Sequence, residues 1–224
     1  MRINDDFSRP LFVDSWHLDW KSSPASGVER RMLFRIGDEV AQATSIVRYA
    51  PQSAFPRHTH RGGEEFLVLA GVFKDERGDY GEGAYIRNPP GTAHAPASEH
   101  GCTIFVRLWQ FRRDDSAHIV RHPGEGLLVS PPSGARSALI LFDDGHEQVR
   151  MEEYLPAATV TVANLLGLEF FLFSGSLTID GVTFNRHAWG RLPQRFPFIA
   201  EAGPEGARIW MKQGPLCHHD ACTL

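Results

Sequence analysis

The sequence predicts an all-β protein made of two like domains, and two observations support this prediction. Short apolar runs recur along the chain and are separated by Gly, Pro and Asp, a pattern typical of β-sandwiches and β-barrels. The 21 glycines and 15 prolines of the 224 residues lie mainly between these runs. The second observation is an internal repeat, in which one stretch of sequence returns about 104 residues later.

The expected elements follow in chain order. Residues 1 to about 25 contain Trp16 and Trp20 without a helical period, which indicates an irregular arm or edge segment that covers a core face. Five apolar runs with the length and spacing of strands come next. They are Met32–Ile36, Ala43–Tyr49, Glu65–Phe73, Gly83–Arg87 and Thr103–Phe111. We expect residues 74–80 to form a polar turn and residues 112–116 a polar linker.

The repeat sets the expected domain boundary. Residues 65–71 (EFLVLAG) return as residues 169–175 (EFFLFSG), and Pro89 meets Pro193 at the same offset of 104. The run that ends at Gln110 meets the run that ends at Gln213 at an offset of 103. We therefore expect two domains, residues 1–115 and 116–224.

Four side chains in the first domain are candidate metal ligands. His58 and His60 are two residues apart, so on a β-strand they point to the same face, about 6 to 7 Å apart. Glu64 follows the Gly62–Gly63 turn, which returns its carboxylate toward the two histidines. His94 comes 30 residues beyond Glu64, after a further strand and turn. Three imidazoles and one carboxylate suit a borderline divalent ion, so we expect one such metal site.

The second domain lacks all four candidate ligands. At the offset of 104 their places are taken by Val162, Asn164, Leu168 and Phe198. Residues needed only to build the fold would be kept in part, so their loss indicates that the four side chains serve the first domain alone. We expect the second domain to fill the equivalent space with side chains. Glu65, next to the candidate ligand Glu64, is expected to point outward or to support the site from behind the ligands; it is also the alternative ligand, because the sequence does not fix the strand parity after the Gly62–Gly63 turn.

Six residues are candidates for lining a pocket around the metal. They are Phe55, Phe66, Tyr85, Phe105, Arg107 and Trp109. Strand alternation places Phe105, Arg107 and Trp109 on one face, and only one face of that strand can point inward. Ordinary core packing is the alternative role for each aromatic residue.

The spacing of these residues resembles the two sequence motifs of the cupins. The first motif is matched by His58, His60, Glu64 and Gly71, and the second by Gly83, Pro89, Gly91 and His94. Residues 63–80 and 87–96 are similar, more narrowly, to the ChrR-type cupins, which form the metal-bearing domain of zinc-containing anti-sigma factors. The resemblance covers about residues 12 to 112 and departs from the family pattern at Gln52 and Ser98. In the second half of the chain it continues only as a degenerate repeat.

This resemblance implies the fold and the cofactor. The fold would be two tandem cupin barrels, each a double-stranded β-helix or jelly roll. The cofactor would be one divalent metal ion, with zinc expected and iron, manganese or nickel as alternatives.

The resemblance also implies a function, namely binding or sensing of a small organic or oxidised ligand at the metal. The alternative is an iron-type dioxygenase that acts on a diketone or hydroxyketone, so whether the protein is an enzyme stays open. The helical zinc-binding region of full-length ChrR-like proteins has no counterpart in this sequence, which argues against binding of a sigma factor.

Composition excludes several other classes of protein. The net charge of −4 gives no sign of nucleic-acid binding. No run reaches the ~18 apolar residues of a membrane span, and the first residues lack the apolar core of a signal peptide, so we expect a cytoplasmic protein that does not bind membranes. Three cysteines without a C-x-x-C pair do not indicate a disulfide scaffold. The Cys and His residues at 217–222 are expected to belong to a tail rather than to a second metal site, and homodimerisation is left open.

Overall fold

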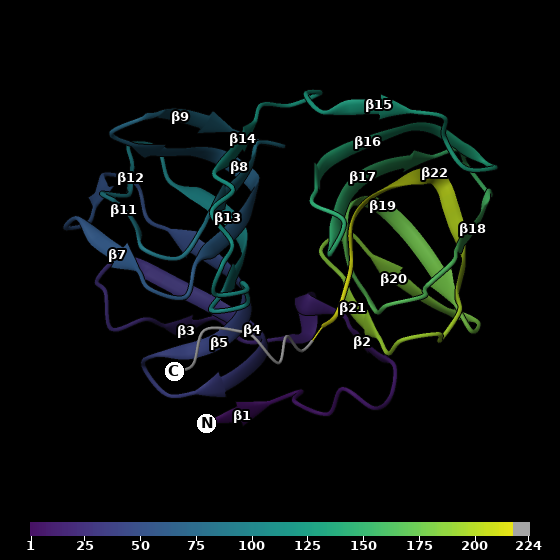
Figure 1. Ribbon diagram of the computed structural model, residues 1–224, viewed down its shortest axis with the longest axis horizontal. Coiled ribbons are helices and arrows are strands. Elements are labelled where there is room, and N and C mark those ends of the chain that lie inside the picture. The colour runs from purple at the N-terminus through teal and green to yellow at the C-terminus, as the bar shows by residue number, and fades with distance from the viewer. Residues whose placement is uncertain (217–224) are drawn as a thin grey trace. The chain divides into compact units, whose positions relative to one another are not determined.

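The computed structural model describes residues 1–216, which form two compact units. Residues 1–5 and 18–124 belong to the first unit, and residues 6–17 and 125–216 belong to the second. This division differs from the expected boundary at residue 115, because the first unit continues to residue 124 and the second unit also takes residues 6–17 from the N-terminal arm. Within each unit the strands curve round into a barrel (Figure 1). The cysteines and histidines at 217–222 lie outside the described residues.

The first unit is all antiparallel β-structure. Its strands are β1 (Arg2–Ile3), β3 (Lys21–Ser22), β4 (Val28–Gly37), β5 (Ala41–Tyr49), β6 (Ser53–Ala54), β7 (His58–His60), β8 (Glu64–Asp75), β9 (Gly78–Gly81), β10 (Tyr85–Asn88), β11 (Thr92–His94), β12 (Ala97–Ser98), β13 (Cys102–Leu108) and β14 (Ile119–Arg121). The main sheet has the order β1-β4-β5-β13-β8-β10-β14, and β7 and β11 form a separate two-stranded sheet.

The second unit repeats this order strand for strand. Its elements are β2 (Leu11–Val13), the 3-10 helix η1 (Ser15–His17), β15 (Leu127–Val129), β16 (Ala135–Asp143), β17 (Gln148–Tyr154), β18 (Thr159–Val162), β19 (Leu168–Ile179), β20 (Val182–Asn185), β21 (Trp189–Leu192) and β22 (Phe198–Gln213). The sheet order is β15-β16-β17-β22-β19-β21-β2. No helix in residues 1–216 is long and apolar enough to cross a membrane.

Cross-strand pairs show which residue of the second unit corresponds to each residue of the first. His94 on β11 pairs with His58 on β7, and Phe198 on β22 pairs with Val162 on β18, which agrees with an offset of 104. At the end of the repeat the offset is 105, because Leu108 pairs with Glu64 and Gln213 pairs with Leu168. The expected offset of 103 is therefore wrong at this point, since Gln110 lies beyond the end of β13 and is not the counterpart of Gln213.

The N-terminal arm and the chain after residue 111 each add the last strand to the sheet of one unit. The arm supplies β2, which pairs with β21, and the chain after residue 111 supplies β14, which pairs with β10. The interpretation of residues 112–116 as a polar linker is wrong, because Asp115 is buried and accepts a hydrogen bond from Arg87 at 2.7 Å. This ion pair fixes the segment against the first sheet.

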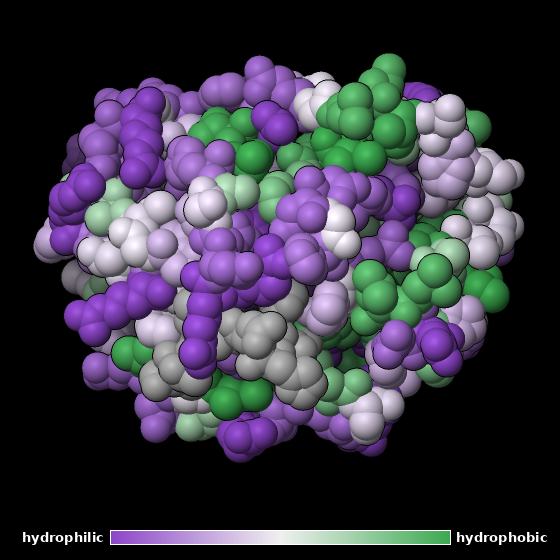
Figure 2. Space-filling view, in the orientation of Figure 1, coloured by the Kyte–Doolittle hydropathy of each residue, from purple (hydrophilic) through white to green (hydrophobic). Residues whose placement is uncertain are grey.

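Strand β15 ends the second sheet and carries exposed apolar side chains. Leu127 and Leu128 are 65% and 70% exposed. Figure 2 shows apolar surface in the region where Figure 1 places β15. An exposed apolar edge strand is a site at which chains can associate, so homodimerisation stays a prediction for this protein.

Candidate metal centre

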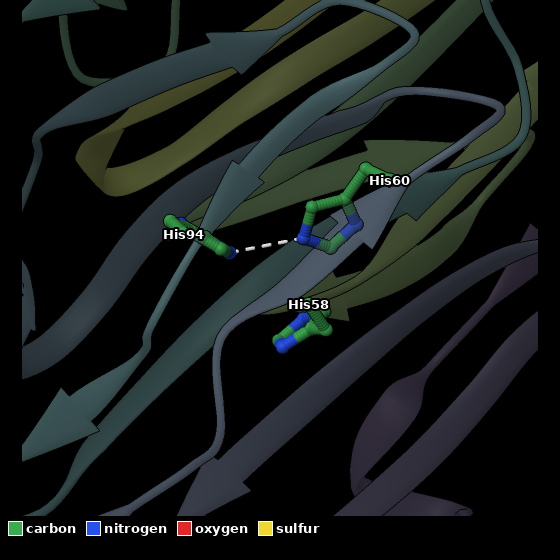
Figure 3. A group of neighbouring side chains, drawn as sticks. All are labelled: His58, His60 and His94. Carbon is green, nitrogen blue, oxygen red and sulfur yellow. Dashed lines mark hydrogen bonds between the residues drawn. The ribbon is translucent and has the colours of Figure 1, made fainter.

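Three histidines of the first unit converge on one point (Figure 3). His58 and His60 come from β7, and the antiparallel partner strand β11 brings His94 opposite His58. One ring nitrogen of each histidine lies within 4.8 Å of the others, and the Nε2 atoms of His60 and His94 are 2.9 Å apart. His94 is buried and His58 is exposed, so the cluster opens to solvent on one side.

A carboxylate joins this cluster from β8. The Oε2 atom of Glu64 lies 3.5 Å from Nε2 of His60 and 3.4 Å from Nε2 of His94. Asn88 on β10 donates a hydrogen bond from Nδ2 to the same oxygen at 3.2 Å. Glu64 and Asn88 are direct partners in the β8–β10 register, which fixes the carboxylate toward the histidines.

These distances fit a single divalent ion. Ligand atoms about 2.1 Å from one ion are about 3.0 Å apart when they subtend a right angle and about 3.4 Å apart at the tetrahedral angle. The separation of 2.9 Å between His60 and His94 corresponds to the first case, and the separations of 3.4 and 3.5 Å from Glu64 correspond to the second. His60, Glu64 and His94 therefore have the donor atoms and the spacing of a metal site, and a ring nitrogen of His58 lies within 4.8 Å of those of the other two histidines.

Neighbouring groups select the ring nitrogen that faces the site. Nδ1 of His58 lies 3.0 Å from the carbonyl oxygen of Pro56, and Nδ1 of His94 lies 3.2 Å from Oδ2 of Asp75. A carbonyl or carboxylate oxygen can only accept, so both Nδ1 atoms carry the hydrogen. Nε2 of each ring then presents its lone pair to the cluster, the arrangement usual for metal-binding histidines.

Asp75 was not among the expected site residues. The sequence predicted only a polar turn at residues 74–80, yet the Asp75 side chain is 3% exposed and also accepts hydrogen bonds from Tyr80 Oη at 3.2 Å and from the Arg77 backbone at 2.8 Å. Burial would raise the pKa of Asp75, but the hydrogen bonds from His94, Arg77 and Tyr80 lower it below its usual value. Asp75 is therefore ionised and holds the His94 ring in place.

The ring nitrogens of His60 and His94 respond differently to their surroundings. Burial lowers the pKa of His60, and this effect exceeds the opposing charge of Glu64. Burial would also lower the pKa of His94, but the hydrogen bond to Asp75 and the charge of Glu64 raise it above its usual value. This difference identifies Asp75 as the group that controls His94.

We expect Asp75→Asn to weaken metal binding about 10-fold to 100-fold, because the amide no longer fixes the tautomer and orientation of the His94 ring. The measurement is a calorimetric titration with a divalent metal. Asp79→Asn is the matched control, because Asp79 is exposed on the neighbouring strand β9 and, among the described residues, its carboxylate pairs only with the half-buried Lys74. Equal affinities for the two variants would contradict the role of Asp75.

Two aromatic residues hold the turn between His60 and Glu64. A Cβ on Gly62 would lie 2.2 Å from the Trp109 ring, and a Cβ on Gly63 would lie 2.4 Å from the Phe111 ring. The Trp109 backbone also donates a hydrogen bond to the Gly63 carbonyl at 3.2 Å. The turn can therefore contain only glycines. Trp109 was expected to line the pocket, but it covers this turn instead.

The interpretation of Tyr85, Phe105 and Arg107 as pocket residues is wrong. The inward face of the sheet carries Phe66, Ile86, Ile104 and Val106, which pack in one core cluster. Because alternate residues point to opposite faces, Tyr85, Phe105 and Arg107 lie on the other face. There Tyr85 and Arg107 both hydrogen-bond to the buried Glu65.

The second unit keeps one bond of this network although it lacks the metal ligands. Trp189 and Glu169 occupy the positions of Tyr85 and Glu65, and the Trp189 indole donates to Glu169 at 2.8 Å. A bond present in both units has a structural role rather than a ligand-binding one. The remaining two expected pocket residues, Phe55 and Phe66, lie on the histidine side through contacts with Tyr49 and Phe73.

The second unit replaces every polar group around the cluster. Val162, Leu168 and Phe198 lie in its core at the positions of His58, Glu64 and His94, whereas Asn164 at the position of His60 donates to two loop carbonyls. Leu192, Ile179 and Phe184 take the places of Asn88, Asp75 and Tyr80 and also pack in this core. Asn88, Asp75 and Tyr80 were missed, and a comparison of the two repeats position by position could have found them.

Residues 8–112 match the model of a protein family, the ChrR Cupin-like domain. The fold is that of the cupins. No curated protein sequence matches the chain. The match ends at residue 112 and includes His58, His60, Glu64 and His94, so the metal-ligand motifs and the family resemblance lie in the same part of the chain.

Solved structures with the same fold span both cupin units. A candidate dioxygenase from Nostoc punctiforme has a TM-score of 0.72 at 12% identity, covering 96% of this chain and 87% of that chain. A pirin from Escherichia coli in complex with nickel(II) has a TM-score of 0.67 at 12% identity, covering 93% and 100%. The oxalate decarboxylase of Bacillus subtilis, with Mn(II) centres, has a TM-score of 0.61 at 12% identity, covering 95% and 79%. Identities this low show a shared fold alone.

Proposed function

We propose that the first cupin unit binds one divalent metal ion through His58, His60, Glu64 and His94, and that this centre binds or senses a small ligand with oxygen donors. The observation that carries the proposal is the convergence of three histidines, whose ring nitrogens lie within 4.8 Å of one another, with a Glu64 oxygen 3.5 Å from Nε2 of His60 and 3.4 Å from Nε2 of His94. A bound ion would supply a Lewis acid and a place for an oxygen ligand.

The charge of the site selects the ligand class. Three neutral imidazoles and one carboxylate leave a net charge near +1 on a divalent ion, which favours an anionic oxygen ligand such as a carboxylate or an enolate. The exposed His58 lies on the open side of the cluster, while the buried His94, Glu64 and Asn88 close the opposite side. A small ligand would therefore approach past His58.

The identity of the metal belongs to the same proposal. The ChrR resemblance favours zinc, and the nickel(II) and Mn(II) of similar structures support a wider choice. Four protein ligands saturate a tetrahedral zinc ion but leave two positions open on a six-coordinate ion. Zinc is the choice that fits an inert sensor, and a six-coordinate ion is the choice that fits a reactive centre.

The second candidate function is an iron-dependent dioxygenase acting on a diketone or hydroxyketone. The ligand set favours it, because three nitrogens and one carboxylate oxygen would hold a six-coordinate iron with two positions left for a bidentate substrate. The resemblance in fold to a candidate dioxygenase is compatible with this function.

Metal analysis followed by oxygen uptake separates the two candidates. Protein purified without added metal is expected to contain about one divalent ion per chain, and His60→Ala is expected to contain almost none. His146→Ala, which removes an exposed histidine of the second unit, is the control and should keep the ion. Oxygen uptake on a panel of diketones after iron loading would favour the dioxygenase, whereas stoichiometric zinc without uptake would exclude it. A His60→Ala protein that keeps its full metal content would refute the site.

A further inference from the structure

The inward face of β5 carries a tyrosine that sequence analysis did not single out. Tyr49 pairs with Cys102 on β13, and both pack on the core cluster that contains Phe66 and Phe73. The Tyr49 ring meets Phe73 edge to face at 5.9 Å between centroids, and Phe73 lies 5.8 Å from the His94 ring. Tyr49 therefore points into the same interior as the metal cluster.

The Tyr49 hydroxyl lies in the electrostatic field of the candidate ligand Glu64. Burial raises the pKa of Tyr49, and the negative charge of Glu64 adds to this effect. The phenol is therefore neutral at pH 7 and has a hydrogen to donate. Among residues 1–216, no side chain or carbonyl forms a hydrogen bond with this hydroxyl.

The second unit shows what the same tyrosine does without a metal site. Tyr154 is the counterpart of Tyr49, because it pairs with Ala207 as Tyr49 pairs with Cys102. Its hydroxyl donates to Glu152 at 2.7 Å, and Arg150 pairs with that carboxylate at 3.2 Å. Val47 occupies the position of Glu152 in the first unit, so the protein partner of the hydroxyl is missing there.

This contrast leads to one inference, which rests on the proposed metal centre. We propose that Tyr49 is a ligand-positioning residue whose hydroxyl donates a hydrogen bond to an oxygen atom of an anionic ligand, a small carboxylate or enolate, bound at the metal. The ligand would provide the acceptor that Glu152 provides in the second unit. Phe55 and Phe73, which contact the Tyr49 ring on two sides, hold the phenol in this position.

The test compares Tyr49→Phe with Tyr154→Phe in the full chain. Each protein is loaded with Co(II), whose visible absorption reports both metal binding and ligand exchange, and is then titrated with oxalate and with acetylacetone. We expect Tyr49→Phe to bind Co(II) as the wild type does and to bind the probes about 10-fold more weakly, the loss typical of one hydrogen bond to a charged acceptor. Tyr154→Phe should lower the stability of the fold and leave both affinities unchanged.

Three results would overturn the inference and leave the proposed metal site standing. Equal probe affinities for Tyr49→Phe and the wild type would show that the hydroxyl does not touch the ligand. A loss of Co(II) affinity in Tyr49→Phe would show that the hydroxyl acts on Glu64 instead. A loaded wild-type protein that binds neither probe would show that no such ligand is accepted. Failure of the wild type to bind Co(II) at all would refute the proposed function itself, and the inference with it.

Discussion

Replacement of His94 by phenylalanine is expected to reduce metal affinity by roughly 10²-fold to 10³-fold. Phenylalanine is the residue that the second unit has at this position, Phe198, where it is fully buried. Structural metal sites contribute about 10–16 kcal/mol, so the loss of one ligand of four costs roughly 3–4 kcal/mol. A calorimetric metal titration measures this loss. A His94→Phe protein with the affinity of the wild type would contradict the assignment of His94.

The same substitution is expected to destabilise the protein without metal by about 1–3 kcal/mol. The buried Asp75 loses its partner on His94, and an unpaired buried charge is costly. Adding Asp75→Ile, the residue found at position 179 of the second unit, should restore most of this loss, because the pair then becomes apolar as in the second core. The free energy of unfolding in urea, measured for both single variants and the double variant, gives the coupling energy. A coupling energy near zero would mean that Asp75 does not act through His94.

The second large effect is expected for Gly63→Ala. Gly63 has φ +76°, and an added Cβ would lie 2.4 Å from the Phe111 ring. Phe111 is fully buried and lies under the Arg87 guanidinium at 4.3 Å, so its ring cannot move away. Left-handed backbone costs a residue other than glycine about 1–2 kcal/mol, and the clash adds about 1–3 kcal/mol. We therefore expect a loss of roughly 2–5 kcal/mol in unfolding free energy, together with weaker metal binding, because Glu64 follows directly.

Gly91→Ala is the matched control for this prediction. Gly91 also has a left-handed backbone, with φ +86°, but a Cβ there would meet nothing within 4 Å. Its cost should be limited to the backbone, about 1–2 kcal/mol. Chemical unfolding of both variants measures the difference. Similar losses for the two glycines would show that the contact between Gly63 and Phe111 does not decide the geometry of the turn.

The faces of the strands were the weakest part of the sequence prediction. Alternation placed Phe105 and Arg107 correctly on one face of β13, but it could not tell which face is inward, and Trp109 lies beyond the end of this strand. Both faces of this strand are buried, so hydrophobicity does not distinguish them. The buried Glu65 decides the matter, since Tyr85 and Arg107 are the groups that satisfy its charge on the outer face.

Asp75 illustrates a second limit of sequence reasoning. Its neighbours Lys74, Glu76 and Arg77 are charged, and a run of charged residues is usually a solvated turn. Only the return of the chain through β11 brings His94 within 3.2 Å of the Asp75 carboxylate and removes that carboxylate from water. The signal that distinguishes Asp75 from its neighbours is its apolar counterpart in the second unit, Ile179.

The amino-acid sequence by itself determined the all-β class, the repeat and the candidate ligands His58, His60, Glu64 and His94, because these depend on spacing along the chain. The tertiary structure decided which side chains surround them. Asn88 on β10 and Asp75 at the far end of β8 reach the cluster through hydrogen bonds that form only in the folded barrel, and Tyr49 on β5 packs into the same interior. Contacts of that kind depend on strand register and on the choice of inward face, which local sequence patterns do not specify.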